Sequence, residues 1–329
     1  MDRFRTDIAA EAAPFSIGHS DRLLLAGSCF TEHIGGRLQA LKFRVRVNPF
    51  GIVYNPASIA GCLERLRAGD RPFGEAELFE NAGLWRSWEH HSDFAAPTPA
   101  DALQRINDAY AADAEWLQNA NRLLLTFGTA DVFALRDTGR IVANNHKMPA
   151  ARFEKRRLSA DEIADATSGI LQKIKSQQPD FQVVLTVSPV RHLREGAVAN
   201  QRSKATLVLA CEALCRHLPF AHYFPAYELL LDDLRDYRFY ADDMIHPSAV
   251  AVGYIWEHFA ETYFSKDTIR LIDRIAKIRQ AMLHRPFRPD LPEHKAFRRT
   301  QLAATEQLKK EYLDLDLREE LAFFRENAG

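Results

Sequence analysis

The sequence predicts an α/β fold, a three-layer α/β/α sandwich with a mainly parallel sheet and a helical extension at its C-terminal end. Short, continuously apolar runs at residues 23–27, 122–127 and 181–187 are too short for helices and predict buried strands. Stretches with helical spacing alternate with these runs. Strands that are apolar on both faces and alternate with helices are typical of a parallel sheet covered on both sides.

The first apolar run ends at Gly27 and Ser28, where the spacing changes to that of a helix. Apolar residues then recur every three or four positions, at Phe30, Ile34, Leu38 and Leu41. Ser28 therefore lies at a strand-to-helix turn, beside unpaired helix amides that can stabilise an oxyanion. Gly27 permits the close backbone approach that such a turn needs. Ser28 is a candidate nucleophile, although a serine at this position more often caps the helix.

Cys29, next to Ser28, is the alternative nucleophile, because an ionised thiol is more reactive than a hydroxyl. Adjacent side chains at such a turn cannot face the same cleft, so only one of the two can act. The cysteines are scattered without a CxxC pair, at Cys29, Cys62, Cys211 and Cys215. They predict neither a zinc site nor a disulfide framework.

A helix at about residues 31–41 is followed by residues 43–47, whose alternating polarity predicts a strand with one exposed face. Residues 48–56 contain two prolines and a glycine and predict a rigid loop. Pro56 then opens a helix that runs to about residue 67. The aromatic segment 84–94 predicts a strand or hairpin laid over the body of the fold.

His90, His91 and Asp93 in that segment invite a metal site. Neighbouring residues on a strand point to opposite faces, so we expect no metal there. Capping signals mark two later helix starts, one at Thr98 and one at the Ser159–Glu162 capping box. Helices are expected at about residues 98–119, 159–175, 199–217 and 249–264, with a last short strand at 221–224.

Polar or small residues follow three of the expected strands. Ser28, Gly128 and Ser188 each come directly after an apolar run. The carboxyl ends of parallel strands meet at one edge of a sheet, and ligands of open α/β folds bind there. This edge is therefore the expected position of the functional site.

Asp243 and His246 lie three residues apart, just before the last helix of the alternating body. A serine hydroxyl needs a base to accept its proton, and that base needs a third group to fix its tautomer and position. The spacing puts both side chains on one side of a turn, although Asp242 would serve nearly as well. A serine after the first strand and an Asp-x-x-His before the last helix predict a catalytic triad.

Residues 1–265 are expected to form the catalytic body, and residues 266–329 a helical extension. The extension is rich in Arg, Lys, Leu and Glu at helical spacing and predicts two long helices joined by a stiff proline loop at 284–292. We expect it to pack on the body, to form a lid or to mediate homo-oligomerisation, and the sequence leaves these three roles open.

Composition excludes several classes of function. With 47% hydrophobic and 26% charged residues the chain is globular, and no apolar run is long enough to span a membrane. Residues 1–13 lack the pattern of a secretory signal, so we expect a cytoplasmic protein. The net charge of −1 does not favour nucleic acid as a partner, and no glycine-rich phosphate loop indicates a kinase or dehydrogenase. We expect no metal and no cofactor.

Several separate blocks resemble the GSCFA family, which looks like a branch of the SGNH (GDSL-like) hydrolase superfamily with its flavodoxin-like sandwich. The resemblance covers roughly residues 15–265. Its blocks lie at residues 25–30, 48–56, 127–130, 144–147, 188–192, 234–240 and 243–247.

The resemblance implies roles for individual residues. Ser28 matches the nucleophile, whose backbone amide also donates to the oxyanion, and Gly51 matches a second amide donor. His246 matches the general base and Asp243 the acid that orients it. The resemblance also makes Asn48, Gly128, His146 and His91 candidate substrate-binding residues, and for each of the two histidines a purely structural role is the alternative.

The third block departs from the superfamily pattern, which usually reads Gly-x-Asn-Asp and supplies an asparagine amide to the oxyanion. Here it reads Gly128-Thr129-Ala130-Asp131. Either Thr129 or one of Asn144 and Asn145 takes the place of the asparagine, or the oxyanion hole has one donor fewer. The loss of a donor lowers the rate by about two to three powers of ten.

The sequence therefore predicts a serine-dependent hydrolase or acyltransferase that acts on an ester by a Ser-His-Asp mechanism. The expected substrate is a small molecule or a glycan, for example one that carries an O-acetyl group. The altered third block keeps open a noncatalytic ligand-binding module on the same fold. A thiol enzyme built on Cys29 is a third hypothesis.

Overall fold

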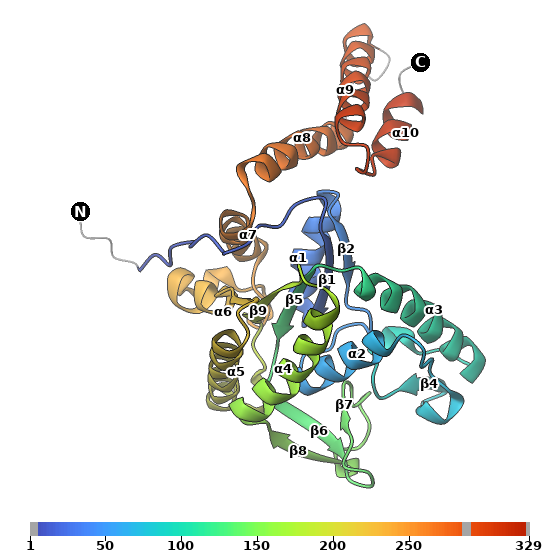
Figure 1. Ribbon diagram of the computed structural model, residues 1–329, viewed down its shortest axis with the longest axis vertical. Helices are drawn as coiled ribbons and strands as arrows, with labels where there is room; N and C mark the ends of the chain where they lie inside the picture. The colour runs from blue at the N-terminus through green and yellow to red at the C-terminus, as the bar shows by residue number, and fades with distance from the viewer. Residues whose placement is uncertain (1–5, 285–290, 327–329) are drawn as a thin grey trace.

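The computed structural model describes residues 6–284 and 291–326. Its centre is a five-stranded sheet in the order β10-β9-β5-β1-β2, in which every neighbouring pair is parallel (Figure 1). The strands are β1 (Arg22–Gly27), β2 (Arg44–Val47), β5 (Arg122–Phe127), β9 (Gln182–Val187) and β10 (Ala221–Tyr223). The predicted parallel α/β fold is confirmed.

Helices cover both faces of this sheet because its strands are apolar on both. On β1, Leu24 and Ala26 face one core and Leu23 and Leu25 the other. The first core is closed by α2 (Pro56–Ala68), α3 (Pro99–Gln118), α4 (Ala160–Gln177) and α5 (Ala197–His217). The second is closed by α1 (Cys29–Ala40), α6 (Ala226–Glu228) with the π-helical turn Leu229–Leu234, and α7 (Ala249–Tyr263).

Two small antiparallel sheets flank the body. The strand or hairpin predicted at 84–94 is correct only for its first part. There β4 (Leu84–Ser87) pairs with β3 (Leu78–Asn81), whereas Ser92–Phe94 form a 3-10 turn. The sequence did not predict the second sheet, in which β6 (Asp131–Leu135) pairs with β7 (Ile141–Val142) and β8 (Phe153–Arg157).

The C-terminal extension contains α8 (Lys266–Leu283), α9 (Pro292–Glu311) and α10 (Arg318–Glu326), one helix more than predicted. The predicted proline loop lies largely outside the described residues. These helices share an apolar cluster of their own and extend from one end of the sandwich (Figure 1). The division at residue 265 remains a prediction.

The extension contacts the body at the amino end of the sheet. Lys42, just before β2, lies 2.7 Å from the buried carboxylate of Glu320 on α10. The carboxyl ends of the strands lie at the opposite end of the sheet, so this position does not suit a lid over them. Among the described residues, no helix has the length and apolar character that a bilayer crossing requires.

Candidate active site

Ser28 follows β1 directly and caps α1. Its hydroxyl accepts a hydrogen bond from the amide of Phe30 (3.3 Å) and donates one to the hydroxyl of Ser188 (2.9 Å), which follows β9. The residue is buried, with an exposed fraction of 2%. The two serines are 160 positions apart in the chain and meet because both follow strands of the same parallel sheet.

Gly27 makes this turn possible. Its φ is +149°, and a Cβ atom at this position would lie 2.3 Å from the carbonyl oxygen of Thr126. A side chain would therefore collide with the backbone of the neighbouring strand. The structure thus explains the glycine before Ser28 by close packing of β1 against β5 as well as by conformation.

Asp243 and His246 lie in the turn before α7. The carboxylate oxygen Oδ2 of Asp243 lies 2.6 Å from Nδ1 of His246, while Oδ1 accepts the amides of Ile245 (2.9 Å) and His246 (3.0 Å). These hydrogen bonds lower the pKa of Asp243 to about 2, and the bond from the His246 amide has the largest effect. The carboxylate is therefore ionised at neutral pH. Within the described part of the chain, Nε2 of His246 has no hydrogen-bond partner.

The turn is strained at its centre. Met244 has a φ of +57°, a left-handed conformation that is uncommon for a residue other than glycine. Arg191 stabilises this strained backbone with two hydrogen bonds. Its amide donates to the carbonyl of Ile245 (3.1 Å), and its guanidinium donates to the carbonyl of Met244 (3.3 Å). Strain of this kind is found where a neighbouring side chain must be held in one position.

His246 lies near the same end of the sheet as Ser28. Burial, with a smaller effect from His246, lowers the pKa of His33 on α1. Burial and then Lys204, again with a smaller effect from His246, lower the pKa of His192 to about 4. No hydrogen bond joins Ser28 to His246 among the described residues, because the hydroxyl of Ser28 is directed at Ser188. The structure brings the two residues to one edge of the sheet without joining them.

The predicted oxyanion donors are engaged elsewhere. The amide of Ser28 donates to Thr126 (3.2 Å) and that of Gly51 to Asn48 (2.8 Å). The amide of Thr129 donates to Tyr54 (3.2 Å), and its hydroxyl lies 3.0 Å from that of Ser203. These groups stabilise the loops in this conformation and are not directed at an open site.

Asn145 is also distant from this arrangement. Its side chain accepts the amide of Lys147 (3.2 Å) within its own turn, between β7 and β8. Asn48 is different: Oδ1 accepts the amide of Gly27 (3.0 Å), while Nδ2 is buried without a partner among the described residues. Asn48 is therefore the side chain that offers an unused amide donor beside the Gly27–Ser28 turn.

Three other predicted residues have clear positions. His146 is buried, with Nε2 2.8 Å from the carbonyl of Ser87 and Nδ1 3.3 Å from Ser92, and burial lowers its pKa to about 4. These contacts tie His146 to β4 and the turn that follows it, and not to the edge of the sheet at Ser28. His91 packs over Gly51, where a Cβ would lie 2.3 Å from that of His91. Gly128 lies at the edge of the sheet beside Ser28, where its carbonyl accepts a hydrogen bond from a lysine side chain.

That lysine, Lys204, is the main functional candidate that the sequence did not reveal. It is 1% exposed, and Nζ donates to the carbonyls of Gly128 and Ser188, each at 2.7 Å. No carboxylate within the described residues forms an ion pair with it. Burial lowers its pKa to about 7.

Lys204 belongs to a buried polar face at the start of α5. Asn200 accepts the amide of His192 (2.8 Å), and Ser203 accepts that of Ala130 (2.8 Å). The spacing of residues 200, 203, 204 and 207 puts them on one side of a helix. Three polar residues on the same side as an apolar leucine are the sequence pattern that could have indicated this buried polar face.

The alternative nucleophile is poorly placed for thiolate chemistry. Burial raises the pKa of the Cys29 thiol, and the charge of Glu32 raises it further. A thiol must ionise to act as a nucleophile. The surroundings of Cys29 therefore favour its protonated, unreactive form.

A surface hollow of about 480 Å³ adjoins the strained turn. Tyr240 lies in it under the guanidinium of Arg191, at 3.8 Å, and Tyr237 and Gln201 also line it. Because Arg191 holds the carbonyls of the Asp243–His246 turn, this hollow is connected directly to the candidate base. Within the described residues, no group of His, Cys, Asp and Glu has the arrangement of a metal site.

Comparison with known proteins gives a family. The model of the GSCFA family matches residues 22–259, and that of the C-terminal domain of GSCFA domain proteins matches residues 275–328. No curated protein matches the sequence.

Two solved structures are similar at low identity. One, described as a platelet activating factor from Streptococcus pneumonia, is 14% identical, with coverage of 73% of this chain and 83% of the other and a TM-score of 0.36. The other, a carbohydrate esterase family 3 from Talaromyces cellulolyticus, is 11% identical, with coverage of 77% and 98% and a TM-score of 0.33. Both TM-scores are too low for these likenesses to carry an argument on function.

Proposed function

This chain belongs to the GSCFA family, and from that premise we propose that it is a serine-dependent hydrolase or acyltransferase that acts on an ester. The observation that carries the proposal is that Ser28 directly follows β1, while Arg191, just beyond the end of β9, holds the Asp243–His246 turn, so that both lie toward the carboxyl edge of one parallel sheet. A buried serine at a strand-to-helix turn and an imidazole oriented by a carboxylate are the parts that nucleophilic acyl transfer requires.

In the proposed reaction, the hydroxyl of Ser28 turns from Ser188 toward Nε2 of His246. Its oxygen attacks the ester carbonyl while Nε2 accepts the proton and the carbonyl electron pair moves to the oxygen. Collapse of this intermediate expels the alcohol, which takes the proton from His246, and leaves an acyl group on Ser28. Water or a second alcohol then removes the acyl group by the same steps in reverse.

Asn48 is the proposed side-chain donor to the oxyanion, in place of the asparagine that the third block lacks. Its unused Nδ2 lies on the residue that already holds the amide of Gly27. In its protonated form, Lys204 adds a buried positive charge beside the same turn, and this charge slightly lowers the pKa of the Cys29 thiol, which burial and Glu32 raise. A fixed charge in a dry site stabilises a developing oxyanion without reorganisation.

The proposed substrate is an O-acyl ester of a polar small molecule or a glycan. The hollow beside the Asp243–His246 turn supports this, because it combines the tyrosines Tyr237 and Tyr240 with hydrogen-bonding groups of Arg191 and Gln201. Aromatic faces with a few directed polar groups suit a ligand that has both hydroxyls and apolar C–H faces.

Labelling with a fluorophosphonate tests the proposal directly. The wild-type chain should be labelled on Ser28, and the label should be lost in Ser28→Ala and His246→Ala. Ser176→Ala, at an exposed serine on α4, is the matched control and should be labelled like the wild type. An unlabelled but folded wild-type chain would refute the hydrolase.

A noncatalytic ligand-binding module is the second candidate. The hydrogen bond from Ser28 to Ser188 and the engaged amides of Ser28, Gly51 and Thr129 favour it, because together they leave the nucleophile and its oxyanion site closed. On this hypothesis, Ser28→Ala leaves the binding of a polar ligand unchanged, and the wild-type chain neither hydrolyses nor transfers an acyl group.

A further inference from the structure

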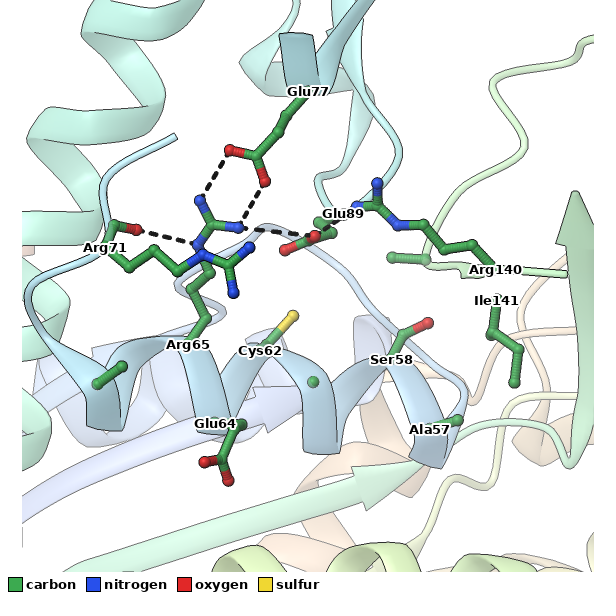
Figure 2. A pocket seen from close by; sticks show the side chains of 13 residues that line it. Ala57, Ser58, Cys62, Glu64, Arg65, Arg71, Glu77, Glu89, Arg140 and Ile141 are labelled. Carbon is green, nitrogen blue, oxygen red and sulfur yellow. Dashed lines mark hydrogen bonds and ion pairs between the residues drawn. The ribbon is translucent and has the colours of Figure 1, made fainter. Parts of the chain in front are cut away.

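A second cavity, of about 630 Å³, lies over the exposed side of α2, and we call it the α2 pocket (Figure 2). Its floor consists of small α2 residues, Ala57, Gly61 and Ala68, with Ser58 and Cys62 between them. Its walls are the segment around Arg71 and Glu77, Glu89, and the start of β7 with Arg140. The volume lies within the range of small-molecule sites, and none of these residues belongs to the Ser28 site.

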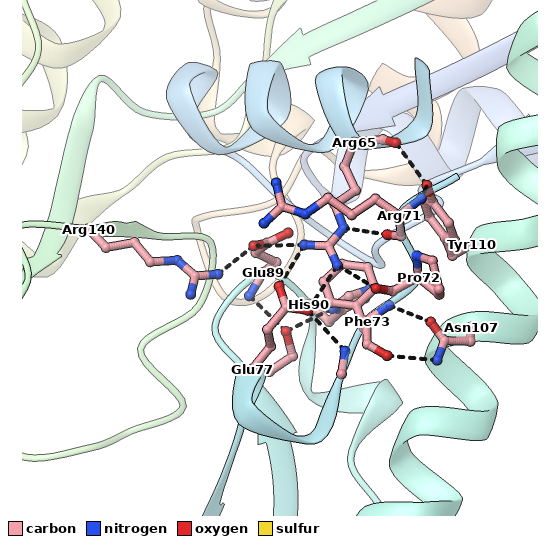
Figure 3. Close-up of polar contacts among 12 residues, drawn as sticks. Arg65, Arg71, Pro72, Phe73, Glu77, Glu89, His90, Asn107, Tyr110 and Arg140 are labelled. Carbon is pink, nitrogen blue, oxygen red and sulfur yellow. Dashed lines mark hydrogen bonds and ion pairs between the residues drawn. The ribbon is translucent and has the colours of Figure 1, made fainter. Parts of the chain in front are cut away.

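Arg65 forms the rigid back of the pocket and is not free to bind a ligand. Its guanidinium makes two hydrogen bonds to Glu77 (2.6 and 3.0 Å) and others to the carbonyls of Arg71 and Pro72, each at 3.1 Å (Figure 3). It also lies 3.5 Å from the ring centre of Phe73. The pair with Arg65 is the main reason why the pKa of Glu77 is lowered, so Glu77 stays ionised and paired.

The backbone of Arg71 is held from two sides. Its amide donates to the hydroxyl of Tyr110 (3.2 Å) on α3, and its carbonyl accepts Arg65. Two residues on, Phe73 exchanges two hydrogen bonds with Asn107 (2.7 and 3.0 Å). The anchored backbone directs the Arg71 side chain over the cavity, as Figure 2 shows.

One positive charge in the pocket, that of Arg71, has no bonded partner among the described residues, and it acts only at longer range on Glu77, whose pKa it helps to lower after the larger effects of Arg65. Glu77 is paired with Arg65, and Glu89 with Arg140. Glu64 is held by Arg67 and Lys173. Among the described residues, the Arg71 guanidinium makes no ion pair and no hydrogen bond.

Hydrogen-bonding capacity is also in surplus. Arg140 bonds to Glu89 through Nη2, which leaves its other N–H groups unused within the described chain. The hydroxyl of Ser58, on the floor, is buried and has no partner there. Guanidinium groups bind planar or tetrahedral oxyanions through paired N–H donors.

We propose that the α2 pocket is a binding site for a small molecule that carries one oxyanion group, a carboxylate or a phosphate ester. Arg71 and the outer N–H groups of Arg140 hold the oxyanion, and the hydroxyl of Ser58 bonds to the polar remainder of the ligand. The two fixed ion pairs, Arg65–Glu77 and Arg140–Glu89, disfavour a cation and make the site rigid before binding. The site is independent of the ester chemistry at Ser28.

Calorimetric titration of the full chain tests this inference, with inorganic phosphate and acetate as separate probes at constant ionic strength. We expect saturable binding of at least one probe, and the two titrations decide between phosphate and carboxylate. Arg71→Gln should weaken binding about tenfold or more, in line with the loss of a charge-assisted contact. Arg299→Gln, which removes the same charge from an exposed arginine on α9, should bind like the wild type.

Ser58→Ala is the second variant, for the case that Arg71→Gln does not fold. It should weaken binding of the preferred probe by a smaller factor than the one expected for Arg71→Gln. The inference is overturned if neither probe binds saturably, or if Arg71→Gln binds as tightly as Arg299→Gln. Fluorophosphonate labelling of Ser28 should be the same in all these variants, so failure of this inference and failure of the proposed esterase are separate outcomes.

Discussion

Lys204 is the residue whose position most needs a physical explanation. A lysine that is fully buried without a carboxylate partner is unfavourable, because the ammonium loses its hydration. Two carbonyl oxygens, from Gly128 and Ser188, compensate in part and are themselves strand-end groups that need a donor. The result is a clamp that fixes the ends of β5 and β9 beside Ser28.

The lowered pKa of Lys204 predicts a pH dependence of stability. The unfolded lysine binds its proton up to about pH 10.5, whereas the folded one loses it at about pH 7. Between these values the unfolded state binds more protons, so the contribution of Lys204 to stability rises with pH. The free energy of unfolding of the wild type minus that of Lys204→Met should rise by up to about 1.4 kcal/mol per pH unit above pH 7. Urea titrations at several pH values measure it, and a constant difference would contradict the prediction.

Asn48 gives a second prediction at this scale. Asn48→Asp keeps the oxygen that accepts the amide of Gly27 and replaces the unused Nδ2 donor by an acceptor. If Nδ2 stabilises the oxyanion, the rate of fluorophosphonate labelling at Ser28 should fall by about 10²–10³-fold. Asn145→Asp makes the same chemical change in a distant turn and should leave the rate unchanged. Equal rates in both variants would exclude Asn48 from the oxyanion site.

At the scale of elements, the site depends on the junction between β1 and α1. Gly27 packs against the backbone of β5, and the same step places Ser28 on the cap of α1. Helix α5 holds the segments that follow β5 and β9, beside this junction, through Asn200, Ser203 and Lys204. A strand, a helix and the loops between them therefore fix the nucleophile together.

Gly27→Ala should be strongly destabilising, because its Cβ would meet the carbonyl oxygen of Thr126 at 2.3 Å. We expect a loss of about 2–4 kcal/mol in the free energy of unfolding. Gly36→Ala in α1 is the control: nothing lies within 4 Å of its added Cβ, and it should stabilise by about 0.5–1 kcal/mol. Thermal unfolding of both variants measures the contrast, and similar values for the two would refute the packing argument.

At the scale of the whole molecule, the helical extension is attached to the amino end of the sheet through a buried ion pair. Glu320 is fully buried and lies 2.7 Å from Lys42 and 3.8 Å from Arg279. The pair joins α10 to the turn before β2, so the extension and the candidate site occupy opposite ends of the sheet. Loss of this attachment should therefore affect the extension first.

Lys42→Met leaves the carboxylate of Glu320 buried with a single, more distant cation. Removal of one partner of a buried pair costs about 3–5 kcal/mol, so α10 should exchange its amide hydrogens faster while the sheet retains its protection. Hydrogen exchange followed by mass spectrometry measures this. Arg270→Gln breaks an exposed pair with Asp267 and should change little. Unchanged exchange in α10 of Lys42→Met would contradict the prediction.

Self-association through the extension remains a prediction of the same scale. Leu283 and Leu313, near the ends of α8 and α9, are 79% and 76% exposed. Light scattering of the full chain and of Leu313→Glu decides it, because a dimer that uses this surface should dissociate in the variant. A monomeric wild type would exclude it.

The sequence by itself determined the elements whose patterns are local. Apolar runs of five to seven residues identified β1, β5 and β9, and their alternation with helices identified the parallel sheet. The antiparallel sheet of β6, β7 and β8 was missed, because β7 has two residues and β8 is mostly charged, with Glu154, Lys155, Arg156 and Arg157 in sequence. Short or polar strands leave no periodic signal.

The same distinction applies to the candidate site. The contact between Asp243 and His246 spans three residues, so spacing alone was enough to put them on one turn. Tertiary structure alone decided that Ser28 bonds to Ser188, that Asn48 keeps a free amide donor and that Lys204 is buried beneath them. These contacts join residues far apart in the chain, and their geometry depends on how the strands and α5 pack, which no local pattern encodes.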